Sequence, residues 1–74
     1  MITDTQKRIL SCIKSFYEKN GMYPSLSELS LEMGYKSKST PNFHTKRLHS
    51  AGYLMVVPHK IRGMMLTDKA KEIV

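Results

Sequence analysis

SLSELSLEMGYKS, residues 25–37, decides the fold because it encodes a short helix that is followed at once by a polar turn. Ser25 can cap the amino end of this helix, and Glu28 stands at the third helical position, where it completes a capping-box pattern. Gly34 is the usual residue just past a carboxyl end. The stretch therefore predicts a helix over 25–33.

An amphipathic helix precedes this stretch. Thr3 and Gln6 repeat the capping-box spacing. Apolar residues then recur at i, i+3, i+4 and i+7, which is the period of one helix face, and Gly21 ends the pattern. The sequence predicts a helix over residues 3–20.

A third helix is expected after the polar turn. Pro41 is tolerated only near the start of a helix, because deeper in it would remove a hydrogen bond and clash with the preceding turn. We therefore expect Ser39 or Thr40 to be the cap and the regular part to cover 41–50. Ala51-Gly52 is expected to end it.

Two β-prone runs follow. Residues 53–57 and 61–66 are expected to be strands joined by a turn at 58–60, and Thr67 is expected to cap a final helix over 68–74. The predicted fold class is α+β, mostly α, in a single domain over the whole chain. It is a three-helix winged helix-turn-helix, with the two-stranded hairpin as the wing and a short final helix.

The positive charge of the chain is confined to its middle. The formal net charge is +6, and no Asp or Glu occurs between Glu32 and Asp68. The segments on either side balance their own charges. A patterned segment that excludes acids while keeping six Lys and Arg residues favours contact with a polyanion, and double-stranded DNA is the first candidate.

Helical phase predicts which side chains of the third helix face outward. With Leu48 taken as buried, Thr45, His44 and Pro41 fall on the inner side. A helix of this kind suits the major groove, where its amino-terminal residues meet base edges. The expected base-reading residues are Ser39, Thr40, Asn42, Phe43 and Lys46.

Specific chemistry follows from two of these residue types. Asn42 can contact adenine through two hydrogen bonds, and Phe43 can touch a thymine methyl group. A slip of one residue in the helical phase would instead place Phe43 in the core. The expected phosphate-binding residues are Ser25, Lys36, Ser37, Lys38, Arg47, Lys60 and Arg62. The hydroxyls in these sets could alternatively act only as caps, and Arg62 could instead pair with Asp68 or Glu72.

The chain also resembles a known family. The run 25–37, the Gly21-Met22-x-Pro24 turn and the segment Arg62-Gly63-Met64-Met65-Leu66 are similar to the amino-terminal DNA-binding domain of the LexA repressors. The resemblance covers roughly residues 3–66. It implies a small bacterial or phage transcription regulator, and repression rather than activation.

The sequence departs from that family in two ways. LexA repressors continue into a second domain that dimerises and cleaves itself with a serine–lysine pair, and we expect no such domain within these 74 residues. Ala51-Gly52 is accordingly expected to be a helix end rather than a cleavage bond. Pro41 and Phe43 replace dissimilar residues of the family's reading helix, so no operator sequence is carried over.

Other functions have little support in the sequence. No paired carboxylates, phosphate-binding glycine loop or catalytic triad is evident, so we expect no enzyme activity and no cofactor. His44 and His49 point to different faces of one helix, and Cys12 has no ligand spacing, so no metal site is expected. No signal peptide or membrane span is evident, and a cytoplasmic, nucleoid-associated protein without a small-molecule ligand is expected.

The main alternative is a protein-interaction module. Winged helices also serve as docking surfaces, for instance in antirepressors or replication assemblies. Such a module would use exposed Phe43, Met55 and Met65 rather than the lysines. A DNA-binding domain of this size would instead be expected to bind as a homodimer, which could form in solution or only on DNA.

Overall fold

Local capping signals set the limits of the first two helices in the computed structural model, which describes residues 2–74. Helix α1 covers Asp4–Asn20 and α2 covers Leu26–Met33. Both capping boxes form, because the Thr3 and Ser25 side chains each accept a hydrogen bond from the backbone N–H of the third helical residue. Gly21 and Gly34 end the two helices in the left-handed conformation. Both predicted helices are confirmed.

Helix α3, Ser39–Ser50, begins earlier than predicted. Lys38 is the residue before its first turn and caps it without a side-chain hydrogen bond, so the expectation that Ser39 or Thr40 is the cap is wrong. Pro41 is the third residue of the helix. The first four N–H groups of a helix have no partner within it, so a proline at this position costs no hydrogen bond and does not set the start.

The hairpin is shorter than predicted. Strands β1, Leu54–Val56, and β2, Met64–Leu66, pair antiparallel with Met55 opposite Met65. Residues 57–63 form a loop between them, here named the wing loop, and the Val57 N–H donates to the Gly63 carbonyl at 2.9 Å across its base. The predicted second strand was too long because its first three residues belong to this loop.

The last helix, α4, covers only Asp68–Lys71. Thr67 caps it as predicted, since its side chain accepts from the Ala70 N–H. Ala70 is fully buried, so this single turn packs on the core. The predicted extension of the helix to residue 74 is wrong.

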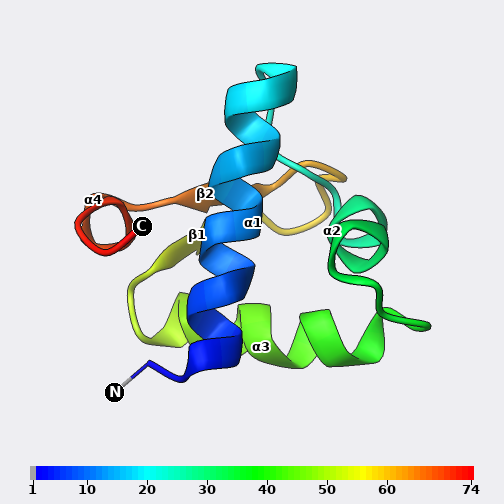
Figure 1. The fold of residues 1–74 in the computed structure, drawn as a ribbon, viewed down its shortest axis with the longest axis horizontal. Coiled ribbons are helices and arrows are strands. Elements are labelled where there is room, and N and C mark those ends of the chain that lie inside the picture. Colours follow the sequence, from blue (N-terminus) through cyan, green and yellow to red (C-terminus); the bar gives the residue numbers. More distant parts are fainter. Residues whose placement is uncertain (1) are drawn as a thin grey trace.

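One apolar core joins all these elements. Helix α1 contributes three fully buried side chains, and α2, α3, the hairpin and α4 close around them. The core residues are Ile9, Leu10, Ile13, Leu29, Leu48, Leu54, Met64, Leu66 and Ala70. Figure 1 shows α3 along the lower edge, α2 at one side and α1 running from beside α3 to the opposite edge. This packing leaves the outer side of α3 uncovered.

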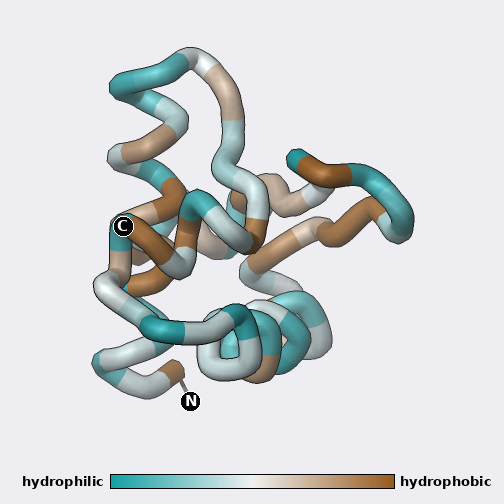
Figure 2. The backbone as a smooth tube through the Cα atoms, turned by 90° about the vertical axis from the view of Figure 1, so that its right-hand side faces the viewer, coloured by the Kyte–Doolittle hydropathy of each residue, from teal (hydrophilic) through white to brown (hydrophobic). Residues whose placement is uncertain are grey.

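The tip of the wing loop projects from the body of the domain, while its Arg62 end lies against α2. Figure 2 shows the hairpin projecting to the right, with hydrophilic residues and an isolated hydrophobic one around its tip. No helix within residues 2–74 is long and apolar enough to cross a membrane.

Candidate nucleic-acid interface

Most of the side chains of α3 that helical phase predicts to be buried or exposed are so in the structure. Leu48, Thr45 and Pro41 are buried against the core, whereas Phe43 is 53% exposed and Lys46 is exposed. The alternative in which Phe43 belongs to the core is therefore wrong. Asn42 is half-buried, and its backbone carbonyl accepts a 3.1 Å hydrogen bond from the Thr45 hydroxyl.

Phe43 and Arg47 form one unit on the outside of α3. The Arg47 guanidinium carbon lies 4.9 Å from the centroid of the Phe43 ring, a cation–π distance. The two residues are four apart, so their spacing could have predicted the contact. The stacking holds an aromatic ring and a positive charge side by side on the helix face that would enter the major groove.

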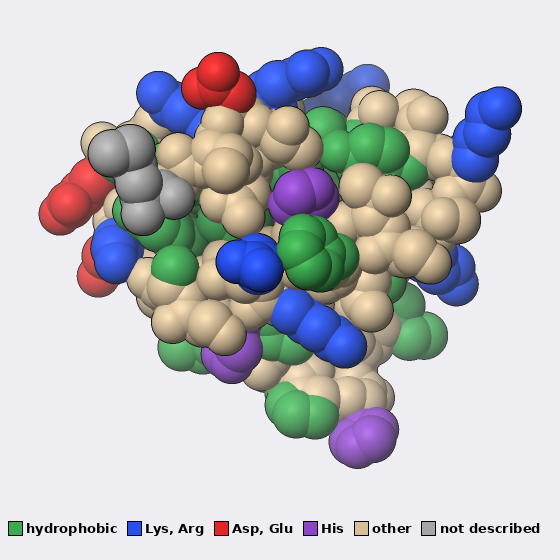
Figure 3. Space-filling view, turned by 90° about the horizontal axis from the view of Figure 1, so that it is seen from below, with side chains coloured by type: hydrophobic (Ala, Val, Ile, Leu, Met, Phe, Trp, Pro, Cys, Tyr) green, Lys and Arg blue, Asp and Glu red, His purple; other side chains and the backbone are tan. Residues whose placement is uncertain are grey.

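The surface around α3 is basic. Figure 3 views the molecule from the side of α3, and Lys and Arg side chains lie across its middle and right while acidic side chains are confined to the left and upper-left edge. Six exposed cations lie in the middle segment, and Arg62 among them is paired with Glu28. The other five come from the α2–α3 turn, α3 and the wing loop; this set, here named the basic face, is Lys36, Lys38, Lys46, Arg47 and Lys60. Their arrangement matches the predicted approach to a polyanion.

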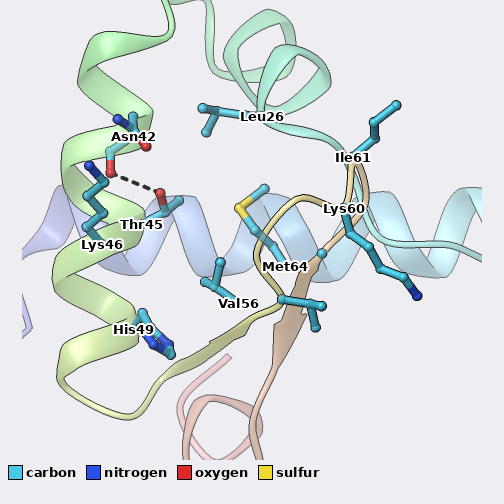
Figure 4. Close-up of a pocket in the computed structure, with 11 residues that line it drawn as sticks. Leu26, Asn42, Thr45, Lys46, His49, Val56, Lys60, Ile61 and Met64 are labelled. Carbon is cyan, nitrogen blue, oxygen red and sulfur yellow. Dashed lines mark hydrogen bonds between the residues drawn. The ribbon is translucent and has the colours of Figure 1, made fainter.

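A groove of about 210 Å³ separates α3 from the wing loop. Its walls carry Lys46 and Lys60, and its floor is apolar, with Val56 and Met64 from the hairpin and Leu26 from α2 (Figure 4). Such a channel, apolar at the bottom, with Lys46 on the α3 side and the Lys60 side chain extending outward on the other side, suits a sugar–phosphate strand. The sequence predicted both lysines but not the groove, because their approach depends on tertiary packing.

Arg62 is held by the fold rather than free on the wing. Its guanidinium pairs with the Glu28 carboxylate, with Nη2 donating to Oε2 at 3.0 Å, and Nη1 also donates to the Tyr23 carbonyl at 3.2 Å. The expected alternative partners, Asp68 and Glu72, are wrong. Since this clamp occupies the guanidinium, the predicted phosphate contact of Arg62 is not carried forward.

The clamp also changes the acid–base behaviour of Glu28. The hydrogen bond from Arg62, followed by that from the Ser25 backbone, lowers the pKa of Glu28 from 4.5 to about 2. A depressed carboxyl pKa means that the pair contributes stability above pH 4.5, which is lost as the pH falls toward 2. At neutral pH the wing loop is therefore tied to the start of α2.

The residues with predicted hydroxyl contacts fall into two groups, one buried and one exposed. Ser25 is buried and serves as the cap of α2, so its predicted phosphate contact is not carried forward. Ser39 and Thr40 are exposed in the first turn of α3, and their base contacts stay predictions. Ser37 is exposed, and its carbonyl accepts from the Ser30 hydroxyl at 3.1 Å, which ties the polar turn to α2.

The apolar residues of the alternative reading differ in exposure. Met55 is 53% exposed on β1, like Phe43 on α3, whereas Met65 is half-buried. Within residues 2–74 no three His, Cys, Asp or Glu side chains gather as metal ligands would.

Replacement of Lys46 tests the basic face directly. Lys46 lines the groove, so we now assign it to a phosphate rather than to a base edge. We expect Lys46→Ala to weaken binding to every duplex and to make the slope of log K against log salt shallower by about one, because one phosphate contact is lost. The measurement is a fluorescence-anisotropy titration at several salt concentrations. The matched control is Lys19→Ala in the last turn of α1, at the end far from α3 (Figure 1); an equal effect of the two variants would refute the placement.

Comparisons with known proteins agree with this geometry. The model of the family described as LexA DNA binding domain matches residues 1–63. The chain is 35% identical over 69 residues to the LexA repressor of Alcanivorax borkumensis, covering 93% of this chain and 34% of the relative. It is 36% identical over 73 residues to that of Carboxydothermus hydrogenoformans, covering 97% and 36%.

A solved structure shares the fold as well. This structure, described as "Crystal structure of a hypothetical protein at 2.2 A resolution", aligns with a TM-score of 0.79 and 27% identity over 99% of this chain and 23% of its own. The chain thus spans about a third of the length of the curated relatives it matches.

Proposed function

Because this chain belongs to the LexA DNA-binding domain family, we propose that it binds double-stranded DNA sequence-specifically and acts as a small repressor-type transcription regulator. The observation that carries the proposal is the uncovered outer side of α3 at the centre of the basic face (Figure 3). The proposed site of action is the nucleoid in the cytoplasm, and the proposed role is binding without catalysis or cofactor.

In the proposed complex α3 enters the major groove. Asn42 and Phe43 face base edges, where an amide can pair with adenine and an aromatic ring can touch a thymine methyl group. Arg47, stacked on Phe43, keeps its predicted phosphate contact at the flank of the helix. The exposed hydroxyls of Ser39 and Thr40 in the first helical turn face base edges, and the lysines of the α2–α3 turn face the phosphates at the rim.

One sugar–phosphate strand is proposed to lie in the groove between α3 and the wing loop. This strand separates the major groove, which holds α3, from the adjacent minor groove. Lys46 and Lys60 stand on its two sides, and the apolar floor accommodates deoxyribose. A bound sugar–phosphate strand would therefore account for the apolar groove with lysines on its borders.

Two copies are proposed to act together. A single small module buries only roughly 600–1,000 Å² on DNA, which limits its affinity and the length of sequence that it reads. Pairing on two half-sites about one helical turn apart would supply both. We therefore propose a homodimer that forms on paired half-sites.

Selection of bound duplexes from a random library tests the proposal. The expected result is enrichment of a defined motif present twice in inverted orientation. A protein-interaction module would instead enrich no motif, and that result would overturn the proposed function.

Asn42→Ala tests the assignment of base reading. We expect this variant to lose preference at one base position of the selected motif, by ~1–3 kcal/mol, while binding to other sequences changes little. The measurement is competition binding with the motif and its single-base variants. If all sequences weaken equally, Asn42 supports the backbone contact and does not read a base.

A further inference from the structure

His49 lies where the groove between α3 and the wing loop meets β1. Its side chain extends from α3 toward the hairpin, close to one helical turn after Lys46, and it is among the residues that line the groove (Figure 4). The ring is exposed, and its Nδ1 lies 3.0 Å from the Leu54 carbonyl oxygen. Neither the base contacts nor the phosphate contacts assigned so far involve this ring.

The hydrogen bond to Leu54 fixes which nitrogen of the His49 ring carries a proton. A carbonyl oxygen can only accept, so Nδ1 is the donor in this bond. Nε2 is then an acceptor in the neutral ring, and it becomes a donor only when the ring takes up a second proton. Among residues 2–74 the ring makes no other hydrogen bond, so Nε2 is available to a ligand in the groove.

A phosphate in the groove can bond to Nε2 only if the His49 ring is protonated. The backbone phosphate oxygens of DNA are acceptors, and Nε2 of the neutral ring is an acceptor as well, so the two cannot form a hydrogen bond. The imidazolium instead offers an N–H and a positive charge, and such charge-assisted hydrogen bonds are roughly twice as strong as neutral ones. The tautomer that Leu54 imposes therefore makes the phosphate contact and the additional proton inseparable.

The lining of the groove contains no carboxylate among residues 2–74. Its charged residues besides His49 are Lys46 on α3 and Lys60 on the wing loop, whereas α2, β1 and β2 contribute only apolar side chains to it. Beyond the groove, Lys69 of α4 donates to the Ala51 carbonyl at the end of α3. A bound phosphate would therefore supply the negative charge next to the ring, and an opposite charge nearby favours the protonated form.

We infer that His49 binds a phosphate of the strand in the groove through Nε2, as the imidazolium, so that DNA binding takes up a proton. The inference rests on the proposed function and adds a phosphate contact where the groove meets β1. The proton passes from the solvent to Nε2 and is then shared in the hydrogen bond to the phosphate oxygen. By linkage, the affinity for DNA rises as the pH falls through the range in which histidine changes its charge, roughly pH 5–8.

The other two histidines do not share this arrangement. His44 Nδ1 is buried without a hydrogen-bond partner among residues 2–74, so a doubly protonated ring would leave an N–H there without an acceptor, which is unfavourable. His59 is exposed on the wing loop and is not part of the groove lining. His59→Gln is therefore the matched control for His49→Gln.

The test measures binding of the selected motif at constant salt, at about pH 6 and about pH 8. Both values lie above pH 4.5, so the clamp between Arg62 and Glu28 is intact in each measurement. Uptake of a single proton changes the affinity by no more than about tenfold per pH unit, and we expect the wild-type protein to bind roughly 3- to 30-fold more tightly at the lower pH. Titration calorimetry in two buffers of different ionisation enthalpy measures the proton uptake directly.

Two variants and a series of modified duplexes assign the proton to His49. His49→Gln carries an amide that can donate at either pH, so it is expected to lose most of the pH dependence, whereas His59→Gln is expected to keep it. In the duplexes, one backbone phosphate at a time is replaced by an uncharged methylphosphonate. Replacement at one position is expected to abolish the pH dependence of the wild-type protein, a result that does not depend on the folding of a variant.

Three results would overturn the inference and leave the proposed function standing. They are equal wild-type affinity at the two pH values, a pH dependence that persists in His49→Gln, and a pH dependence that no single methylphosphonate removes. Failure of the wild-type protein to bind the duplex at either pH would instead count against the proposed function.

Discussion

Leu48→Ala is expected to lower the free energy of unfolding by about 2–5 kcal/mol. Leu48 is 1% exposed and is the largest buried side chain that α3 contributes to the core. Its truncation leaves a cavity in the core beneath α3. Since small domains are stable by only about 5–15 kcal/mol, such a loss removes a large part of the total. Urea denaturation followed by far-UV circular dichroism measures it.

Leu31→Ala is the matched control for this substitution. Leu31 lies on α2 and is 80% exposed, so its truncation is expected to change stability by no more than about 0.5 kcal/mol. If Leu48→Ala is as stable as this control, α3 does not pack on the core as described, and its outer face is assigned wrongly.

Gly63→Ala is expected to destabilise the hairpin by about 1–3 kcal/mol. The added Cβ would lie 2.5 Å from the Val57 carbonyl oxygen, which is backbone and cannot rotate away. We expect the base of the wing loop to open and the Val57 N–H to lose its bond to the Gly63 carbonyl. Amide hydrogen exchange at Val57, together with thermal unfolding, measures both effects.

Lys60→Ala is the control for the loop, because this side chain is exposed and its truncation leaves the backbone unchanged. Its stability is expected to match the wild type within about 0.5 kcal/mol, with normal protection at Val57. Normal protection at Val57 in Gly63→Ala would show that the loop is not tightly closed, and would remove the basis for a fixed wall of the groove.

The features that could be predicted from sequence are local. Thr3 and Ser25 each act on a backbone group three residues away, so their capping boxes are visible in the chain itself. The outward position of Phe43 follows from helical phase, which a small error in the start of α3 does not alter. The start itself was misplaced because Pro41 can occupy any position in the first turn.

The features that were missed depend on residues far apart in the chain. Arg62 and Glu28 are 34 positions apart, and no local pattern identifies them as partners. The same clamp and the close approach at Gly63 make residues 57–63 a loop, although residues 61–66 have the composition of a strand. The groove between α3 and the wing loop arises from that arrangement, so its existence could not be predicted.

Binding to a random 30-base-pair duplex across a salt series tests the central claim most directly. Each neutralised phosphate contributes about −0.9 to the slope of log K against log salt, so the basic face predicts a slope of roughly −3 to −5 per chain. A weak, nearly salt-independent response would contradict the claim that this face lies against nucleic-acid phosphates.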